Sequence, residues 1–222
     1  MNTVKDKKVT GMDYMRLCLT AVLGIGIEVI MAFLLEPIIW KTPMQQWSTG
    51  ACILHWIITC SIWCLLGICI IRRSKMKCGF DPFMPTEKPA AWQWIATAVC
   101  VAVCLMVTWI DWKGCKVLIE FKANGLLKFI FQYIYYLFEV MLFLLIIVYA
   151  QKAFEIWFKK PNIPYGAIIV ALTWGLAHWG TKGSVYAGLL SAAGGFCFGV
   201  VYLLLNRNIK LTYIMLCIMF IL

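Results

Sequence analysis

Long apolar runs, separated by short polar segments, constrain this 222-residue chain more than any other feature. A helix that crosses the hydrocarbon core of a membrane needs about 20 mostly apolar residues. Seven segments are candidates, the last of them short: Tyr14–Leu35, Gly50–Ile71, Ala90–Ile110, Phe129–Ala150, Pro164–Gly180, Ser184–Leu205 and Leu211–Leu222. The sequence therefore predicts an all-α fold, a polytopic bundle of about seven transmembrane helices that forms one integral membrane domain over residues 1–222.

Composition excludes the main alternatives. Hydrophobic residues make up 63% of the chain and charged residues 14%, whereas about a quarter of the residues in a soluble domain are charged. The net charge of +10 would suit a nucleic-acid-binding protein, but the Lys and Arg residues lie between apolar runs rather than along one stripe. We therefore expect the lipid bilayer to surround the chain, and we expect no nucleic-acid partner.

The distribution of basic residues predicts the orientation of the chain. With the predicted spans in place, fourteen Lys and Arg residues fall on the side of the N-terminus and six on the other side. Because the cytoplasmic side of a membrane protein carries the excess of Lys and Arg, we expect a multi-pass protein of the cell membrane with a cytoplasmic N-terminus. Segment 111–128 places apolar residues between lysines and is predicted to be an amphipathic helix at the interface.

Most of the eleven cysteines lie inside apolar runs, and they do not form the Cys/His clusters that a zinc site requires. In apolar surroundings a cysteine behaves as a small hydrophobic residue. We therefore predict neither a disulfide framework nor a metal site, and the sequence leaves any cofactor unassigned.

Small residues recur at every fourth position of segment 184–205. Such stripes let helix backbones approach closely in a membrane. We predict tight packing within one subunit, with dimerisation or a substrate groove as the alternatives. The stripe consists of Ala187, Ser191, Gly195 and Gly199.

Four ionisable side chains of the predicted spans are candidates for function, because a charge inside a membrane is costly and often functional. They are Glu28, His55, Glu139 and His178. Glu28 and His55 lie at matching depths when residues are counted at about 1.5 Å each. We predict that these two face one another as a structural polar pair between the first two helices.

Glu139 and His178 are the candidates for chemistry. Glu139 is the one charged residue of Phe129–Ala150, the most lipid-like stretch of the chain, and a buried carboxylate can act as a general base toward water. His178 shares a helix face with Trp174, four residues earlier. For each residue, a structural hydrogen bond is the alternative to a catalytic role.

Three fragments, FEVMLF, LTWGLAHW and the glycine-rich YAGLLSAAGGFCFGVVYLL, occur in this order along the chain. In this order they resemble the CAAX-protease and bacteriocin-processing (CPBP) family of intramembrane endopeptidases, also called the abortive-infection family, over a family-like core at 129–222. Glu139 matches the first Glu of the family's EExxFR motif, and Phe143 matches its Phe. Trp174 stands in place of the Phe of the FxxxH motif, and His178 matches its His.

The resemblance implies an intramembrane endopeptidase that acts on a peptide or protein substrate. Glu139 and His178 would be its catalytic residues and would activate a water molecule at membrane depth. Phe143 and Trp174 would form the wall of the site and keep bulk water out.

The chain departs from the family at three points. Val140 replaces the second Glu, Leu144 replaces the Arg, and no His lies near Met215–Cys217, where the third motif would supply one to support the oxyanion. Three hypotheses follow: a divergent endopeptidase, an inactive family member that acts as an immunity or membrane-binding protein, and an unrelated small transporter or channel subunit. The order of the motifs favours the first two.

Overall fold

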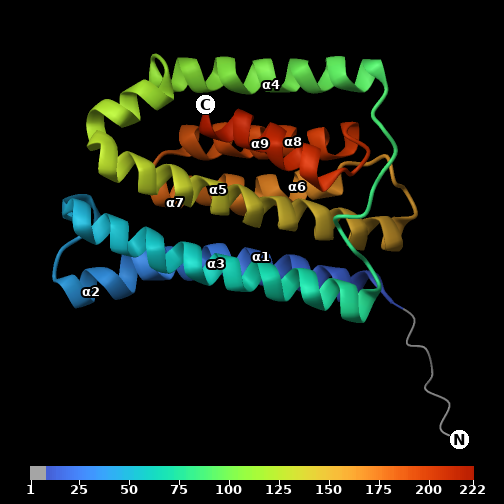
Figure 1. The fold of residues 1–222 in the computed structure, drawn as a ribbon, viewed down its shortest axis with the longest axis horizontal. Coiled ribbons are helices and arrows are strands. Elements are labelled where there is room, and N and C mark those ends of the chain that lie inside the picture. The colour runs from blue at the N-terminus through green and yellow to red at the C-terminus, as the bar shows by residue number, and fades with distance from the viewer. Residues whose placement is uncertain (1–8) are drawn as a thin grey trace, which may run out of the picture.

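The computed structural model describes residues 9–222, which form one bundle of roughly parallel and antiparallel helices (Figure 1). These residues contain no β-strand, so the prediction of an all-helical fold is confirmed for them. The α-helices are α1 (Gly11–Ile30), α2 (Glu36–Trp40), α3 (Thr49–Cys78), α4 (Ala91–Trp112), α5 (Lys116–Phe158), α6 (Tyr165–Val170), α7 (Leu176–Lys182), α8 (Val185–Leu204) and α9 (Ile209–Ile221). Two π-helical turns and one 3-10 turn complete the chain: η1 (Met31–Leu35), η3 (Ala171–Gly175) and η2 (Met44–Gln46).

Within residues 9–222, five helical stretches are long and apolar enough to cross a membrane, which is the character of a multi-pass membrane protein. They are Gly11–Trp40, Thr49–Cys78, Ala91–Trp112, Lys116–Phe158 and Val185–Leu204. The other two predicted spans are weaker. The first consists of α6, η3 and α7, which follow one another without a break over residues 165–182 and are not among these five stretches, and α9 has 13 residues, fewer than the roughly 20 that a span needs.

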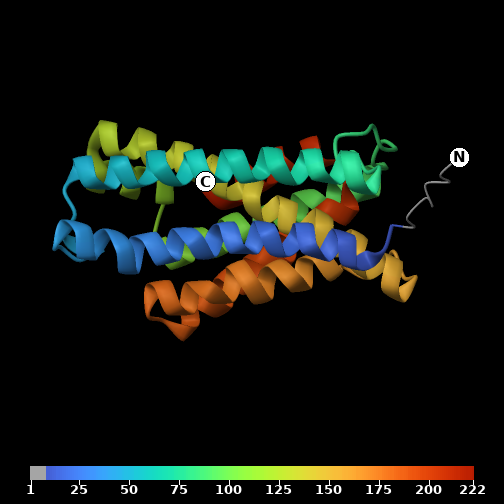
Figure 2. The same cartoon turned by 90° about the horizontal axis from the view of Figure 1, so that it is seen from below.

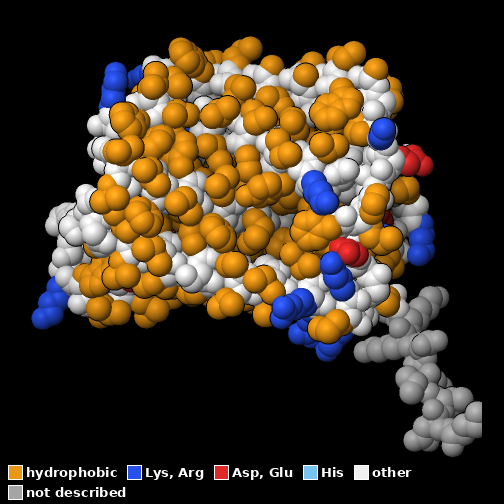
Figure 3. All heavy atoms as spheres, in the orientation of Figure 1, with side chains coloured by type: hydrophobic (Ala, Val, Ile, Leu, Met, Phe, Trp, Pro, Cys, Tyr) orange, Lys and Arg blue, Asp and Glu red, His pale blue; other side chains and the backbone are white. Residues whose placement is uncertain are grey.

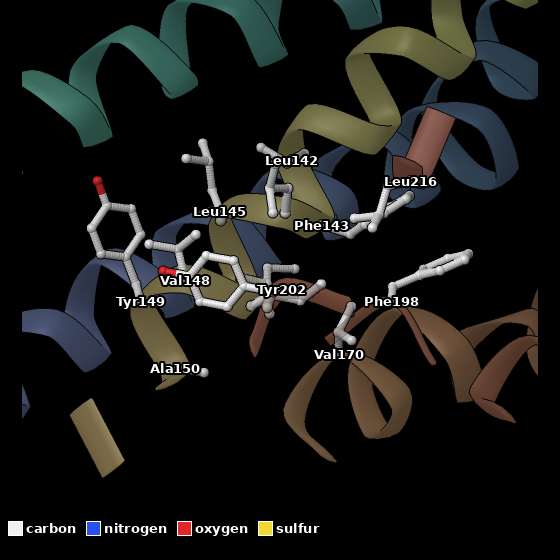
Figure 4. Packing of buried hydrophobic residues seen from close by; sticks show 14 of the residues in the cluster. Leu142, Phe143, Leu145, Val148, Tyr149, Ala150, Val170, Phe198, Tyr202 and Leu216 are labelled. Atoms are coloured by element: carbon white, nitrogen blue, oxygen red, sulfur yellow. The ribbon is translucent and has the colours of Figure 1, made fainter. Parts of the chain in front are cut away.

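Helix α5 is the centre of the bundle. It packs against α1, α3, α6 and α9, and residues 142–151 are buried on every face of the helix. Figure 4 shows the side chains of this stretch directed toward several neighbours, among them Phe198 and Tyr202 of α8. The stretch that looks most suited to lipid from its sequence is therefore the one most enclosed by protein, since a helix that is apolar all round is buried.

The first helix extends further than the sequence predicted. An end at Leu35 was expected because Glu36 and Pro37 follow, but the chain continues through η1 into α2. Pro37 lies in the first turn of α2, directly after the π-turn η1, and a proline inside a continuous helix removes one backbone N–H donor. In Figure 2, α1 lies between α3 on one side and α6 and α7 on the other.

The predicted amphipathic segment 111–128 forms the end of α4 and the start of α5, and part of it is buried rather than interfacial. Gly125 has φ 67° and ψ 170°, a conformation that is essentially restricted to glycine. This residue bends α5, so that its first turns run in a different direction from the rest (Figure 1). Lys116 and Glu120 of these first turns are buried.

The small residues of α8 pack within the same chain. A Cβ atom on Gly199 would overlap the backbone of Ala167, and one on Gly195 would lie 3.4 Å from Ala171 Cα. Both partners belong to α6 and η3. Gly195 and Gly199 thus contact helices of the same chain closely, while Ala187 and Ser191 are half-buried.

Basic side chains gather toward the ends of the bundle. On the face shown in Figure 3, hydrophobic side chains cover the middle and most Lys and Arg side chains lie toward the end from which α1 starts. At that end Lys75 Nζ lies 2.8 Å from Asp81 Oδ2, and this hydrogen bond lowers the pKa of the Asp81 carboxyl. Three of the basic residues counted for the orientation, Lys5, Lys7 and Lys8, lie outside the described residues.

Candidate functional site

A polar cavity of about 570 Å³ lies in the half of the bundle away from the start of α1. It extends to Met44 and Gln45 before α3 and to Lys182 at the end of α7, so it reaches the end of the bundle opposite the first residue of α1. Its ionisable lining residues are Glu28, His55, Lys116, Glu120, Glu139, His178 and Lys182. The structure thus brings all four ionisable candidates from the sequence to one cavity.

Glu139 is placed in this cavity by the central helix α5. Its side chain is buried, with 8% of the residue exposed. Its Oε1 accepts a hydrogen bond of 2.8 Å from Trp174 Nε1. The indole N–H can only donate a hydrogen bond, and the carboxylate oxygen of Glu139 is its acceptor.

His178 lies one turn after Trp174, in the first turn of α7. Its Nδ1 is 2.9 Å from the backbone carbonyl oxygen of Trp174. Because a carbonyl only accepts, Nδ1 carries the hydrogen in this arrangement and Nε2 is left as an acceptor. Single π-turns such as η3 occur frequently at functional sites.

Trp174 therefore connects the two candidates, since its ring binds Glu139 and its carbonyl binds His178. The expectation that Glu139 and His178 share one water molecule stays a prediction.

Phe143, which the sequence predicted to form part of the wall of the site, lies outside the cavity. It is fully buried and does not line the cavity. Its ring packs 4.8 Å from the Trp174 ring and 5.1 Å from the Phe198 ring, measured between centroids. Phe143 thus supports the Trp174 side chain from behind, and Trp174 itself forms the wall (Figure 4 shows Phe143 beside Phe198).

His55 is held between two carboxylates of the first helical stretch. Its Nε2 lies 3.5 Å from Glu28 Oε1, and its Nδ1 lies 2.6 Å from Glu36 Oε2. Only 1% of His55 is exposed. The closer partner, Glu36, has no signal in the sequence, because an acidic residue followed by Pro37 is typical of a helix end.

The π-turn η1 explains how Glu28 and Glu36 reach the same imidazole. Eight residues of regular α-helix would rotate one side chain by roughly 80° from the other. A π-turn takes up about one residue more than an α-turn. The spacing of eight therefore acts like a spacing of seven, which is close to two full turns, and both carboxylates face α3.

A second polar network occupies the bend of α5. Glu120 accepts hydrogen bonds from Gln132 and Tyr136 on Oε1 and from Tyr133 on Oε2, at 2.7–3.0 Å. Lys116, one turn earlier, donates to the carbonyl oxygen of Phe220 at 2.8 Å. Neither residue was a sequence candidate. The i, i+4 spacing of Lys116 and Glu120 is the one signal that pointed to them.

The cavity is lined by hydrogen-bond donors, acceptors and acid–base side chains. Among residues 9–222, no three His, Cys, Asp or Glu side chains gather in a way that could hold a metal ion. All eleven cysteines are free thiols.

Comparison with known proteins adds no relative: no protein-family model, no curated protein and no solved structure matches this chain. The site is thus defined by its own geometry, as a polar cavity enclosed by the helices of a membrane protein.

Proposed function

We propose that the protein is an intramembrane hydrolase, an endopeptidase of the CAAX-protease and bacteriocin-processing type, with Glu139 and His178 as its catalytic residues. One observation carries the proposal. The two side chains line the same cavity, and both are held by Trp174.

The chemistry follows from these groups. Glu139 takes a proton from a water molecule, and the resulting hydroxide attacks the carbonyl carbon of a peptide bond. His178 accepts a hydrogen bond from the same water molecule on Nε2, while its Nδ1–H stays on the Trp174 carbonyl, and so orients the water for attack. The proton held by Glu139 then passes to the leaving nitrogen as the C–N bond breaks, which gives a free amine and a carboxylic acid.

A second candidate function is supported by α9. In the region where the resemblance would place a third-motif His, Leu216 and Met219 are buried apolar residues. A site without that donor loses transition-state stabilisation, typically ~10²–10³ in rate for one oxyanion donor. An inactive immunity or membrane-binding protein would keep the cavity and bind a peptide without cleaving it.

The experiment is a search for new peptide ends. Wild-type protein is reconstituted with solubilised membrane proteins of its host, and new N-termini are labelled and identified by mass spectrometry. Glu139→Gln and His178→Ala are run in parallel, with Glu87→Gln as the control, because Glu87 is exposed and lies far from the cavity.

Cleavage products that occur with wild type and E87Q, and that disappear with E139Q and H178A, are the expected result. The double variant should be no worse than either single variant, since the two residues act as one unit. If wild type and E139Q yield the same set of N-termini, the hydrolase proposal is wrong and the binding function takes its place.

A further inference from the structure

Lys116 is a buried cation without a carboxylate partner among residues 9–222. The residue is 6% exposed, and its one hydrogen bond goes to the carbonyl oxygen of Phe220. Its ammonium group also lies 4.6 Å from the Tyr136 ring centroid and 4.8 Å from that of Phe220. An ammonium group has three N–H donors, so two of them remain for another acceptor.

The nearest acids, Glu120 and Glu139, attract the Lys116 ammonium group through space but form no ion pair with it. Both oxygens of Glu120 accept from neutral donors, namely two tyrosines and a glutamine. Glu139 accepts from Trp174. No described carboxylate lies within 4.0 Å of Lys116 Nζ. A buried charge is costly unless it is paired, and this site therefore favours an anion from outside the chain.

Lys116 also lies where the polar cavity meets a second, apolar pocket of about 180 Å³. The two share one wall, formed by Trp112, Lys116, Trp174, His178, Lys182 and Phe220. The rest of the pocket lies between α4, α8 and α9, where Val103, Val107 and Leu190 are typical lining residues. Asp111 and Lys182 line it as exposed residues.

The pocket suits an aliphatic chain better than a peptide. A peptide backbone that enters a membrane needs a partner for each N–H and C=O group. Apart from Asp111 and the wall that it shares with the polar cavity, the pocket is lined mostly by hydrocarbon, with Thr108 and Ser191 as its hydroxyl groups. An aliphatic chain needs no hydrogen bonds, and a small pocket has no room for the two chains of a phospholipid.

We propose that this pocket binds a single-chain lipophilic carboxylate from the bilayer, with the aliphatic chain between α4 and α8 and the carboxylate on Lys116. The proposal goes beyond the hydrolase function, since it concerns binding and needs no turnover.

The probe for the test is 11-(dansylamino)undecanoic acid, compared with its uncharged methyl ester, on purified full-length protein in a neutral detergent. We expect the acid to bind more tightly than the ester. Lys116→Met should weaken binding of the acid by about 10–100-fold, the value of a hydrogen bond to a charged group, and leave the ester unchanged. Lys116→Arg should retain most of the affinity.

Two further variants make the test decisive. Lys122→Met removes an exposed lysine of the same helix that lines neither pocket, and it should not alter binding. Gly194→Leu adds a side chain inside the apolar pocket, where a Cβ has room, and it should weaken acid and ester alike.

The proposal is overturned if K116M, eluting as a single folded species, binds the acid as well as wild type does. It is also overturned if an apolar tetrapeptide with a free C-terminus binds through Lys116 while the fatty-acid probe does not, because the ligand would then be a peptide. Loss of peptide cleavage in E139Q tests the hydrolase function separately and does not affect either outcome.

Discussion

His55 is bound unequally by its two carboxylates. The contact with Glu36 is 2.6 Å long and that with Glu28 is 3.5 Å. Glu36 is also the more buried of the two, with a side-chain exposure of 7% against 14%. Hydrogen bonds to charged groups are stronger than neutral ones, so Glu36 should contribute more to the stability of the α1–α3 pair than Glu28 does.

The prediction is that Glu36→Gln lowers the free energy of unfolding by about 1–2 kcal/mol. Glu28→Gln should lower it by only about 0.6 kcal/mol, the average for polar contacts in membranes. Glutamine keeps the shape of the side chain and removes its charge. SDS titration in mixed micelles, followed by circular dichroism, measures both values, and an equal or larger loss for E28Q would contradict the assignment.

Individual residues also show which parts of the candidate site can be predicted from the sequence. The four ionisable candidates stand out because they interrupt apolar runs, and the structure brings them to one cavity. Glu36 directly follows the first predicted span, and Lys116 and Glu120 lie in the predicted amphipathic segment 111–128. At such positions a side chain can usually reach water. Their burial depends on a π-turn and on a bend at Gly125, and neither has a clear sequence signal.

At the scale of the elements, the hydropathy of the sequence predicts where helices occur, but it does not predict whether each helix contacts lipid or protein. Lipid and protein interior are equally apolar, so an apolar helix does not reveal which of them it contacts. The sequence of α5 looks suited to contact with lipid, but the helix lies at the centre of the bundle. Helix α4 is also a long apolar helix, yet most of its residues are exposed on the outside of the bundle. The order of the long helices and the approximate limits of most of them can be predicted from the sequence, although α5 extends well beyond the predicted Phe129–Ala150 at both ends. The positions of α4 and α5 in the bundle depend on tertiary contacts, which the sequence does not show.

The bend of α5 provides a prediction at this scale. Gly125→Ala should destabilise the protein by about 1–3 kcal/mol, because alanine does not tolerate the backbone angles at this position. Gly26→Ala in α1 is the control, since a Cβ there meets no atom within 4 Å and alanine favours a helix. Unfolding in mixed micelles compares the two, and equal stability of G125A and G26A would show that the bend is not required.

The contact between α8 and α6 provides a second prediction at the scale of the elements. A Cβ on Gly199 overlaps the Ala167 backbone, whereas one on Gly194 has its nearest neighbour at 3.9 Å. Gly199→Ala should therefore cost about 1–3 kcal/mol through overpacking, and Gly194→Ala should cost almost nothing. If the two variants unfold at the same detergent concentration, the two helices do not approach as closely as the structure shows.

The whole molecule has two unlike ends. Basic residues concentrate at the end where α1 starts and α3 stops, and the polar cavity reaches the other end. If the basic end is cytoplasmic, the cavity faces away from the cytoplasm, and a water-soluble peptide or ion would enter it from outside the cell. The side on which a substrate is met thus depends on the orientation of the bundle.

We predict that the N-terminus is cytoplasmic. Single cysteines at positions 77 and 182, introduced into a variant without the eleven native cysteines, report the two ends, because Lys77 and Lys182 are both exposed and lie at opposite ends of the bundle. A membrane-impermeant maleimide should label K182C in intact cells and should label K77C only after the membrane is permeabilised. Labelling of K77C alone in intact cells would reverse the orientation and would open the cavity to the cytoplasm.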